Sequence, residues 1–262
     1  MSRIQKHPIL TPKPSVPFSF RFDGQPVASH QGETIAAALF AAGIHVFGHH
    51  PKDGSPQGLF CANGQCSQCL VIADGVPVKA CMTPAQPGLC VQSMSGLPVL
   101  PGGATASTTE VGDIVETDVL ILGGGPAGLS AALELAQSPA RILLVDDKDR
   151  LGGKLVLQTH RFFGSTEAVY AGTRGMEIGE RLGHQVMEQE NVDVWLNSTA
   201  LAVYSDRVVG VLRGSSEFVR VRPRVLLAAT GARERSLSFQ GNTLPGVYGA
   251  GAFQTLVNRD LV

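Results

Sequence analysis

The segment "LFCANGQCSQCLVIADGVPVKACMTP", residues 59–84, contains four of the chain's five cysteines. Intervals of four, two and eleven residues separate them, in the order Cys61, Cys66, Cys69 and Cys81. A C-x4-C-x2-C run followed by one more cysteine is typical of plant-type ligation of a [2Fe-2S] cluster. We therefore predict that these four thiolates hold such a cluster.

Zinc and disulfides are the alternatives for these thiols. Structural zinc sites usually combine two C-x2-C pairs, and this segment offers one, Cys66 and Cys69. Disulfides need an oxidising compartment, whereas the N-terminal stretch "MSRIQKHPILTPKPS" has no apolar signal region. We expect a cytoplasmic protein with reduced or metal-bound thiols. Cys90 falls outside the pattern and is interpreted as a small buried apolar residue, and His49 and His50 as loop residues.

Charge and hydropathy exclude several partner classes. The chain has 21 Lys and Arg residues against 22 Asp and Glu residues. This balance predicts no binding of nucleic acid or of an anionic membrane surface. The uncharged stretch from 119 to 133 is shorter than the roughly 20 apolar residues that a bilayer span requires, so no membrane insertion is expected.

The cysteine segment lies in an N-terminal region with α+β character. Phenylalanines alternate with polar residues over 18–22 and meet Asp23-Gly24, a strong hairpin signal. An alanine-rich helix is predicted from about Thr34, with Gly43 ending it. A second hairpin is predicted over 70–78. We expect a small α+β domain over 1–100 and a Gly- and Pro-rich linker over 101–116.

The second half of the chain, 117–262, has α/β character. Gly123, Gly125 and Gly128 form G-x-G-x-x-G between a buried strand and a helix, a pattern in which the helix N-terminus receives a dinucleotide pyrophosphate. Asp146 ends the next strand, where an acid would accept hydrogen bonds from ribose hydroxyls and disfavour the 2′-phosphate of NADP. A helix near 173–190 and three short strands between 201 and 222 follow. The apolar run "RVLLAATGA" predicts a last strand in the middle of a parallel sheet.

Two stretches carry a family resemblance. The segments "PFSFRFDGQPVASHQGETIAAALFAAG" and "GLFCANGQCSQCLVIADGVPVKACMTP" resemble the N-terminal [2Fe-2S] domain of the hydrogen cyanide synthase, opine oxidase and sarcosine oxidase alpha subunit family. The resemblance implies a ferredoxin-like β-grasp domain ahead of a Rossmann-like FAD-binding domain.

The segments "DDKDRLGGK" and "LLAATGARER" are similar to flavoproteins related to the disulfide reductases. This similarity implies that the dinucleotide bound at the glycine loop is FAD. The similarity adds Gly152, Gly153, Lys154, Thr230 and Gly231 to the residues of the glycine motif. The predicted cofactor-binding residues are therefore Gly123, Gly125, Pro126, Ala127, Gly128, Asp146, Gly152, Gly153, Lys154, Thr230 and Gly231. Gly152-Gly153 can also be an ordinary turn, and Lys154 replaces a glutamine that is more usual there.

The same resemblance implies that the FAD domain is incomplete. The segment "GNTLPGVYGAGAFQTLVN" leads, in the family, into a second dinucleotide domain, and no second G-x-G-x-x-G follows it. A partner supplying the remainder and a truncated product are both compatible with this pattern.

A flavin handles two electrons and an iron-sulfur cluster passes them singly. We expect an electron-transfer oxidoreductase subunit of a multi-subunit amine or amino acid dehydrogenase, of the sarcosine, opine, proline or glycine type. A second flavoprotein subunit would oxidise the small-molecule amine. No catalytic residues are identified, and His160, Glu180 and His184 are interpreted as surface residues. A cluster-containing redox sensor or binding module without turnover, and a truncated non-functional fragment, are the alternatives.

Overall fold

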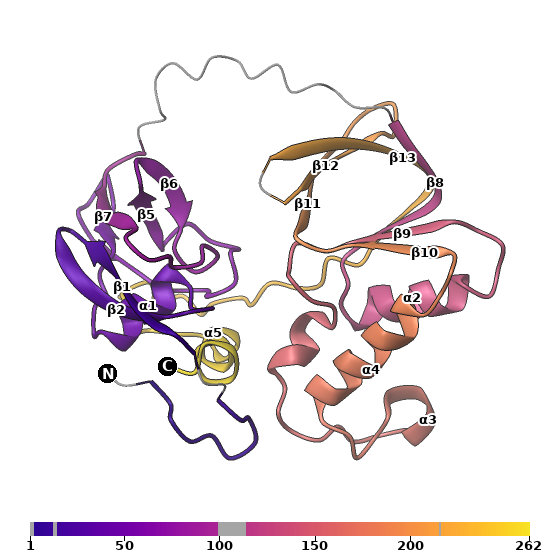
Figure 1. Cartoon of the computed structure of the whole chain (residues 1–262), viewed down its shortest axis with the longest axis horizontal. Coiled ribbons are helices and arrows are strands. Elements are labelled where there is room, and N and C mark those ends of the chain that lie inside the picture. Colours follow the sequence, from indigo (N-terminus) through magenta and orange to yellow (C-terminus); the bar gives the residue numbers. More distant parts are fainter. Residues whose placement is uncertain (1–2, 13–14, 99–113, 215) are drawn as a thin grey trace. The chain divides into compact units, whose positions relative to one another are not determined.

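The computed structural model describes residues 3–12, 15–98, 114–214 and 216–262. The chain divides into two compact units (Figure 1). The first combines Met1–Thr105 with Arg233–Val262, and the second is Ala106–Ala232. Most of the expected linker, 101–113, lies outside the described residues, and residues 114–116 belong to a strand.

The first unit is the expected β-grasp domain. Its sheet runs in the order β2-β1-β7-β3-β4, with β5 paired to both β6 and β7. The two central strands, β1 and β7, are parallel, and the hairpin strands β1 and β2 are antiparallel. The elements are β1 (Pro17–Phe22), β2 (Gln25–His30), α1 (Ile35–Ala41), β3 (Gly48–His49), β4 (Pro56–Gln57), β5 (Leu70–Ala73), β6 (Val76–Lys79) and β7 (Cys90–Ser95).

Local signals in the sequence account for the start of this unit. Asp23 and Gly24 both have positive φ values, 49° and 79°, as a type I′ hairpin turn requires. The Thr34 side chain accepts a hydrogen bond from the Ala37 amide and so caps α1. Gly43 follows the helix with a φ of 80°. The predicted hairpins and helix are confirmed.

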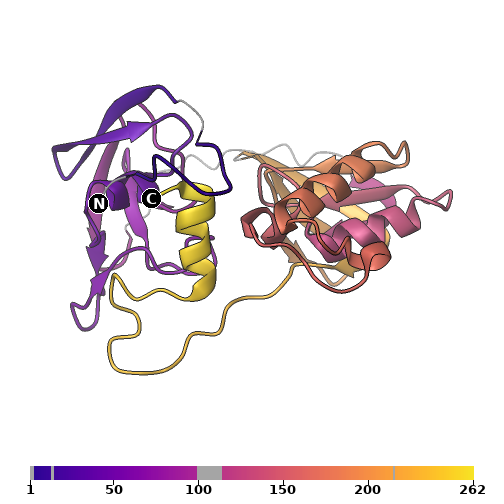
Figure 2. The same ribbon diagram turned by 90° about the horizontal axis from the view of Figure 1, so that it is seen from below.

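The C-terminal segment completes the core of the first unit. It forms α5 (Ala250–Thr255) and a π-helical turn, η2 (Leu256–Asp260). Ala252 and Leu256 are each only 2% exposed and belong to the same apolar cluster as the side chains of α1. Figure 2 shows this helix, coloured yellow, against the first unit. The compact unit that contains the glycine loop ends at Ala232.

The second unit is a Rossmann-like α/β fold with sheet order β10-β9-β8-β13-β12-β11. Strands β10, β9, β8 and β13 pair in parallel, and β12 and β11 extend the sheet in antiparallel fashion. One apolar cluster joins α2 and α4 to the sheet, and a second joins β8 and β9 to the antiparallel strands. The elements are β8 (Ile114–Leu122), α2 (Pro126–Leu135), β9 (Ile142–Val145), η1 (Gly153–Leu157), α3 (Thr166–Val169), α4 (Gly175–Met187), β10 (Val192–Trp195), β11 (Ser198–Val203), β12 (Val209–Arg213) and β13 (Glu217–Ala228).

The last strand differs from its prediction. The third short strand and the apolar run are one continuous strand, β13, with Pro223 inside it. Its second half is not in the middle of the sheet, because β12 pairs with β13 only as far as Val221. Val225 consequently remains 55% exposed. In the part of the chain described here, no helix combines the length and the apolar character that crossing a bilayer requires.

Candidate cofactor-binding sites

The cysteine loop connects β4 to β5, and the last cysteine follows β6. Cys61 and Cys66 are partly exposed, whereas Cys69 and Cys81 are each only 1% exposed. Ala62 and Gly64 have positive φ values of 53° and 79°, so the backbone coils tightly between the first two cysteines. The Ala80 amide donates a 2.9 Å hydrogen bond to the Cys69 carbonyl, which joins the two buried cysteine positions.

The four thiols are linked in a row, in the order Cys66, Cys61, Cys81 and Cys69. Cys61 is hydrogen-bonded to Cys66 and Cys81, and Cys81 is also hydrogen-bonded to Cys69. Hydrogen bonds from Cys66 and Cys81 lower the pKa of the Cys61 thiol well below its usual range. The hydrogen bond from Cys81 likewise lowers the pKa of Cys69. The pKa values of Cys66 and Cys81 are raised in return, because each donates its proton to a neighbouring thiolate.

This donor set fits a binuclear cluster. Among the described residues, no group of three or more His, Cys, Asp or Glu side chains is arranged to hold a metal ion. The thiols instead contact one another in pairs, Cys61 with Cys66 and Cys69 with Cys81, joined by Cys61 and Cys81. Four cysteine thiolates are the ligand set of a [2Fe-2S] cluster, and the C-x4-C-x2-C spacing distinguishes this loop from the usual zinc site with two C-x2-C pairs.

The prediction that the fifth cysteine, Cys90, is buried is wrong. Cys90 is exposed at the start of β7, not buried. Its amide donates to the Asp74 carboxylate at 3.0 Å, while the thiol remains at the surface. His49 also differs from its interpretation, because it belongs to β3 and pairs with Pro56.

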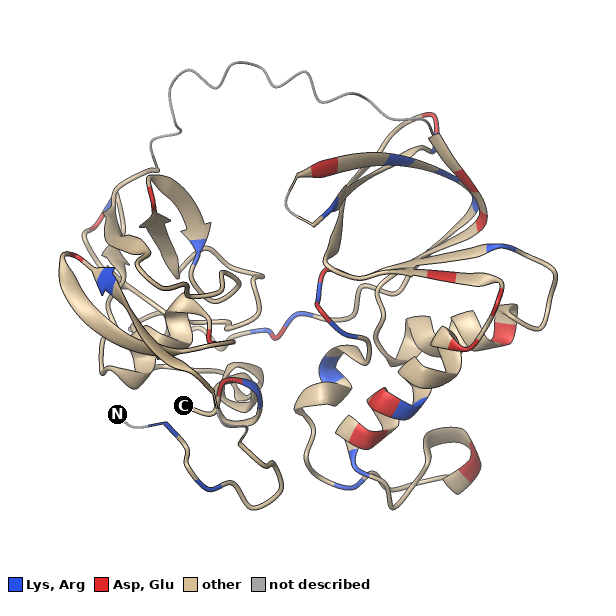
Figure 3. Cartoon of the chain, in the orientation of Figure 1, with Lys and Arg blue, Asp and Glu red and all other residues tan. Residues whose placement is uncertain are grey.

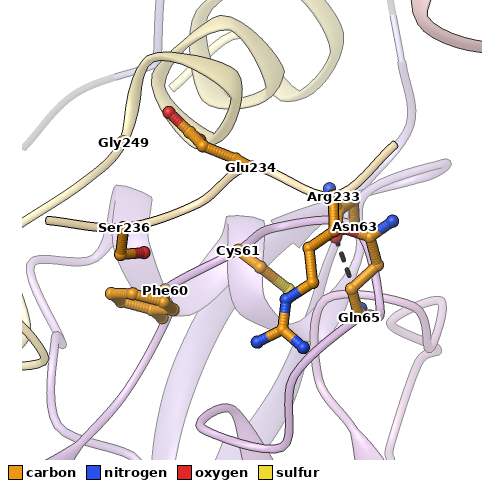
Figure 4. Close-up of a pocket in the computed structure, with 8 residues that line it drawn as sticks. All are labelled: Phe60, Cys61, Asn63, Gln65, Arg233, Glu234, Ser236 and Gly249. Atoms are coloured by element: carbon orange, nitrogen blue, oxygen red, sulfur yellow. Dashed lines mark hydrogen bonds between the residues drawn. The ribbon is translucent and has the colours of Figure 1, made fainter. Parts of the chain in front are cut away.

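A small hollow of about 30 Å³ lies beside the cysteine loop, within the first unit. Cys61 lines it together with Asn63 and Gln65 of the loop and Arg233 of the C-terminal segment. Figure 4 shows the Arg233 side chain extending past the Cys61 sulfur, while the Glu234 carboxylate points away. That carboxylate accepts a 3.1 Å hydrogen bond from the Gly251 amide in the first turn of α5. The face of the loop nearest Cys61 is therefore polar and carries one cation.

In the second unit, the glycine loop follows β8. Gly123 has a φ of 111°, and a Cβ there would lie 2.3 Å from the Ala229 carbonyl oxygen. A Cβ on Gly128 would lie 1.9 Å from the Gly123 carbonyl oxygen. These two positions require glycine, because α2 packs directly on the turn that ends β8.

Asp146 at the end of β9 binds this loop. Its Oδ2 accepts a 2.6 Å hydrogen bond from the Gly124 amide, and its Oδ1 accepts one of 2.8 Å from the Lys148 amide. The side chain is buried. A carboxylate has about four lone-pair positions, so these two bonds leave acceptor capacity for a ribose.

Of the remaining predicted residues, Gly152 and Gly153 border the same loop, whereas three others are exposed. Gly152 donates a 2.8 Å hydrogen bond to the Gly124 carbonyl, and Gly153 lies against Gly125. Ala229, beside Gly123, leads directly into Thr230 and Gly231, which are exposed. Lys154 is exposed as well.

The glycine loop also fits an anionic dinucleotide. Gly125 is the N-cap of α2, with no side-chain cap, and the first turn of the helix contains no acidic residue. A Cβ on Gly125 would meet only the Gly153 Cα, at 3.9 Å. The space above the helix N-terminus is thus open, and the helix presents amide donors and partial positive charge to it. Pro126 and Ala127 are exposed in the first turn of the same helix.

Comparison with known families agrees with this geometry. The model for pyridine nucleotide-disulphide oxidoreductases matches residues 117–258. The chain belongs to this oxidoreductase family. The model for the 2Fe-2S iron-sulfur cluster binding domain matches residues 15–96 of the same oxidoreductase. The two matches assign it a [2Fe-2S] cluster and FAD.

Relatives of this oxidoreductase are subunits of larger enzymes. Sarcosine oxidase subunit alpha from Corynebacterium sp. is 29% identical over 253 residues, covering 90% of this chain and 26% of that protein. Hydrogen cyanide synthase subunit HcnB from Pseudomonas protegens is 34% identical over 144 residues, covering 55% of this chain and 30% of that protein. The chain thus spans less than a third of the length of these relatives.

Among solved structures, L-proline dehydrogenase from P. horikoshii has the same fold. The TM-score is 0.77 at 24% identity, covering 96% of this chain and 48% of that one. The order of the two units, a ferredoxin-like domain followed by a flavoprotein domain, is therefore confirmed. The roles of individual residues in cofactor binding remain predictions.

Sequence reasoning missed three residues at these sites. Gly124 was not singled out, although its amide binds Asp146. Lys79 and Arg233 were also missed; Lys79 contacts the cysteine loop, and Arg233 lies beside it. The G-x-G-x-x-G spacing contains Gly124 as an unspecified position. Nothing in the local sequence connects Arg233 with a loop more than a hundred residues earlier.

Proposed function

We propose that this oxidoreductase chain relays electrons between FAD and a [2Fe-2S] cluster within a multi-subunit amine or amino acid dehydrogenase. One observation carries the proposal: a single chain contains both four neighbouring cysteine thiols, three of them in one loop, and a glycine loop held by a buried carboxylate. When bound, the flavin supplies two-electron chemistry and the cluster supplies one-electron transfer.

Different residues of this chain are proposed to bind the cluster and the FAD. Cys61, Cys66, Cys69 and Cys81 supply the four thiolates, two of them from buried positions. The amides at the start of α2 would hold the pyrophosphate, and Gly123 and Gly128 let this helix pack closely on the turn after β8. Asp146 holds the glycine loop and would accept hydrogen bonds from the ribose.

We propose that substrate oxidation takes place on a second flavoprotein subunit, acting on a small amine or amino acid. The relatives' names describe subunits of sarcosine oxidase and hydrogen cyanide synthase, which supports a partner of this kind. His160, Glu180 and His184 are exposed and are not part of either cofactor site. Reduced thiols fit a cytoplasmic location.

The test is a cofactor inventory of the full chain, purified without oxygen. We expect about two irons, two acid-labile sulfides and one FAD per chain, after saturation with FAD where needed. One zinc ion without labile sulfide would refute the cluster. A cluster without flavin at FAD saturation would refute the relay and favour a sensor.

The relay is then tested by photoreduction of the bound flavin. We expect the cluster's visible absorption to bleach together with the flavin bands, and an EPR signal of the reduced cluster to grow in. A Cys69→Ser variant is the control, because its flavin is expected to be reduced without that signal. Persistence of the oxidised cluster beside fully reduced flavin would contradict electron exchange within the chain.

A further inference from the structure

The cysteine loop has almost no charge of its own. Residues 54–73, which include three of the four cysteines, contain no Asp, Glu, Lys, Arg or His. In Figure 3 the ribbon leading into β5 is tan, whereas blue marks a basic residue on β6. That residue is Lys79, at the C-terminal end of β6. Any fixed charge close to the cluster must come from outside the loop.

The Lys79 ammonium reaches into this uncharged loop. Its Nζ donates a 2.7 Å hydrogen bond to the Gly64 carbonyl oxygen, in a partly buried position. Gly64 lies between Cys61 and Cys66 and has a φ of 79°. A Cβ there would lie 2.9 Å from the Met82 side chain, so the Gly64 backbone is confined on both sides. The contact therefore fixes the peptide that curves around the first two thiols.

The backbone of Lys79 is itself firmly anchored. Lys79 pairs with Leu70 across the β5–β6 hairpin. Its carbonyl accepts hydrogen bonds of 2.9 Å from the Met82 amide and 3.1 Å from the Thr83 amide, in the turn that contains Cys81. The Thr83 hydroxyl adds a third bond, of 3.0 Å, to the same carbonyl. Lys79 thus links the turn of the fourth cysteine to the loop of the first two.

We propose that Lys79 is a positioning residue for the [2Fe-2S] cluster: it holds the 61–66 loop through Gly64 and favours the reduced state of the cluster. Reduction adds one negative charge to the cluster, and a partly buried ammonium stabilises that charge more than an exposed one does. Hydrogen bonds and charges around the sulfurs are known determinants of cluster potential. The inference rests on the proposed function, because it requires that the cluster be present.

The experiment compares Lys79→Met, Lys79→Arg and Lys52→Met in the full chain, each purified without oxygen. Lys52 is an exposed lysine of the same unit that lies outside the 54–73 stretch, and it serves as the matched control. The readouts are the midpoint potential from an EPR-monitored titration and the rate of iron release to a chelator. We expect Lys79→Met to lower the potential, by roughly a tenfold change in the reduction equilibrium, which is about 59 mV for one electron.

Iron release from Lys79→Met is expected to be several-fold faster, and Lys79→Arg should restore both values toward those of the wild type. A Lys79→Met potential and release rate equal to those of Lys52→Met would overturn the inference. If Lys79→Met does not retain a cluster, loading of Lys79→Arg decides the question: a loaded Arg variant supports the role, and an empty one shows that side-chain packing is what matters. Absence of iron and labile sulfide from the wild type would instead refute the proposed function.

Discussion

The Gly124 amide donates a 2.6 Å hydrogen bond to Oδ2 of Asp146, which joins the turn after β8 to the end of β9. Both carboxylate oxygens of Asp146 are used inside the chain, because Oδ1 accepts from Lys148. The acid that was expected to face a ribose thus also holds the glycine loop in place. Its loss should affect folding and flavin binding together.

Replacement of Asp146 by Ala should leave two amides without their acceptor in a buried position. We expect the second unit to lose about 2–4 kcal/mol of unfolding free energy, since each buried unsatisfied donor costs about 1–3 kcal/mol. Flavin occupancy should fall in parallel. Urea unfolding and flavin quantitation measure both effects. Asp147→Ala, at the exposed neighbouring position, is the control and should change stability by less than about 0.5 kcal/mol.

A methyl group at Gly128 should force α2 away from the end of β8. The added Cβ would lie 1.9 Å from the Gly123 carbonyl oxygen, and backbone cannot yield as a flexible side chain can. Gly128→Ala should cost about 3 kcal/mol or more of unfolding free energy and reduce FAD affinity. Ser130→Ala, on the exposed side of the same helix, should leave FAD affinity unchanged. Normal flavin titration of Gly128→Ala would show that the loop does not hold the pyrophosphate.

Serine at position 69 should abolish the cluster, whereas serine at position 90 should not. Cys69 is buried and hydrogen-bonded to Cys81, while Cys90 is exposed and outside the thiol group. We expect Cys69→Ser to lose the visible absorption of the cluster and its labile sulfide, while keeping the flavin bands. Cys90→Ser should keep both at wild-type levels. The opposite pattern would remove Cys69 from the ligand set.

Leu256 should stabilise the first unit although it lies far along the chain from that unit's strands. It is 2% exposed in the core that contains α1. Leu256→Ala should cost about 2–5 kcal/mol of unfolding free energy in that unit. Phe253→Ala, at a position 60% exposed on the adjoining α5, is the matched control. Equal melting temperatures for the two variants would contradict the packing of this segment on the first unit.

Stability below neutral pH should depend on Glu33. Burial raises the pKa of its carboxyl. The hydrogen bond and the charge of Arg3, together with hydrogen bonds from His30 and Ser29, lower the pKa by more than burial raises it. The net shift is therefore downward from 4.5. Protonation therefore opposes the folded state, and the stabilisation present above about pH 4.5 should be lost as the pH falls through the folded pKa. Glu33→Gln should flatten this part of the stability profile. Unfolding curves between pH 7 and 3 measure the difference.

Asp260 should act in the opposite direction. Burial raises the pKa of its carboxyl despite the hydrogen bonds from Arg259. The contribution of Asp260 to the free energy of unfolding should therefore decline as the pH rises through its raised pKa. Because the charge of Glu33 is one cause of this raised pKa, Glu33→Gln should also reduce the Asp260 contribution.

The sequence predicted those parts of the fold that depend on local signals. The Asp23-Gly24 turn, the Thr34 cap and the cysteine spacing each specify a conformation within a few residues. The glycine loop and Asp146 were found because strand, glycines and helix follow one another directly.

Long-range packing could not be predicted in the same way. The helical pattern after residue 248 does not say which core Ala252 and Leu256 join. Cys90 was misjudged because its residue type suggests burial, whereas its place in the β7 register leaves the thiol at the surface. Lys79 was overlooked because its partner, Gly64, contributes only a carbonyl group, which no sequence pattern marks.

The discontinuous makeup of the first unit constrains the order of biosynthesis. Its strands and cysteines are made early, but Ala252 and Leu256, which fill the same core, are translated after the entire second unit. A nascent chain must therefore keep α1 partly uncovered while the flavoprotein unit emerges from the ribosome. Delivery of iron and sulfide to the cysteine loop can begin in that interval, before Arg233 and the residues after it cover the neighbouring surface.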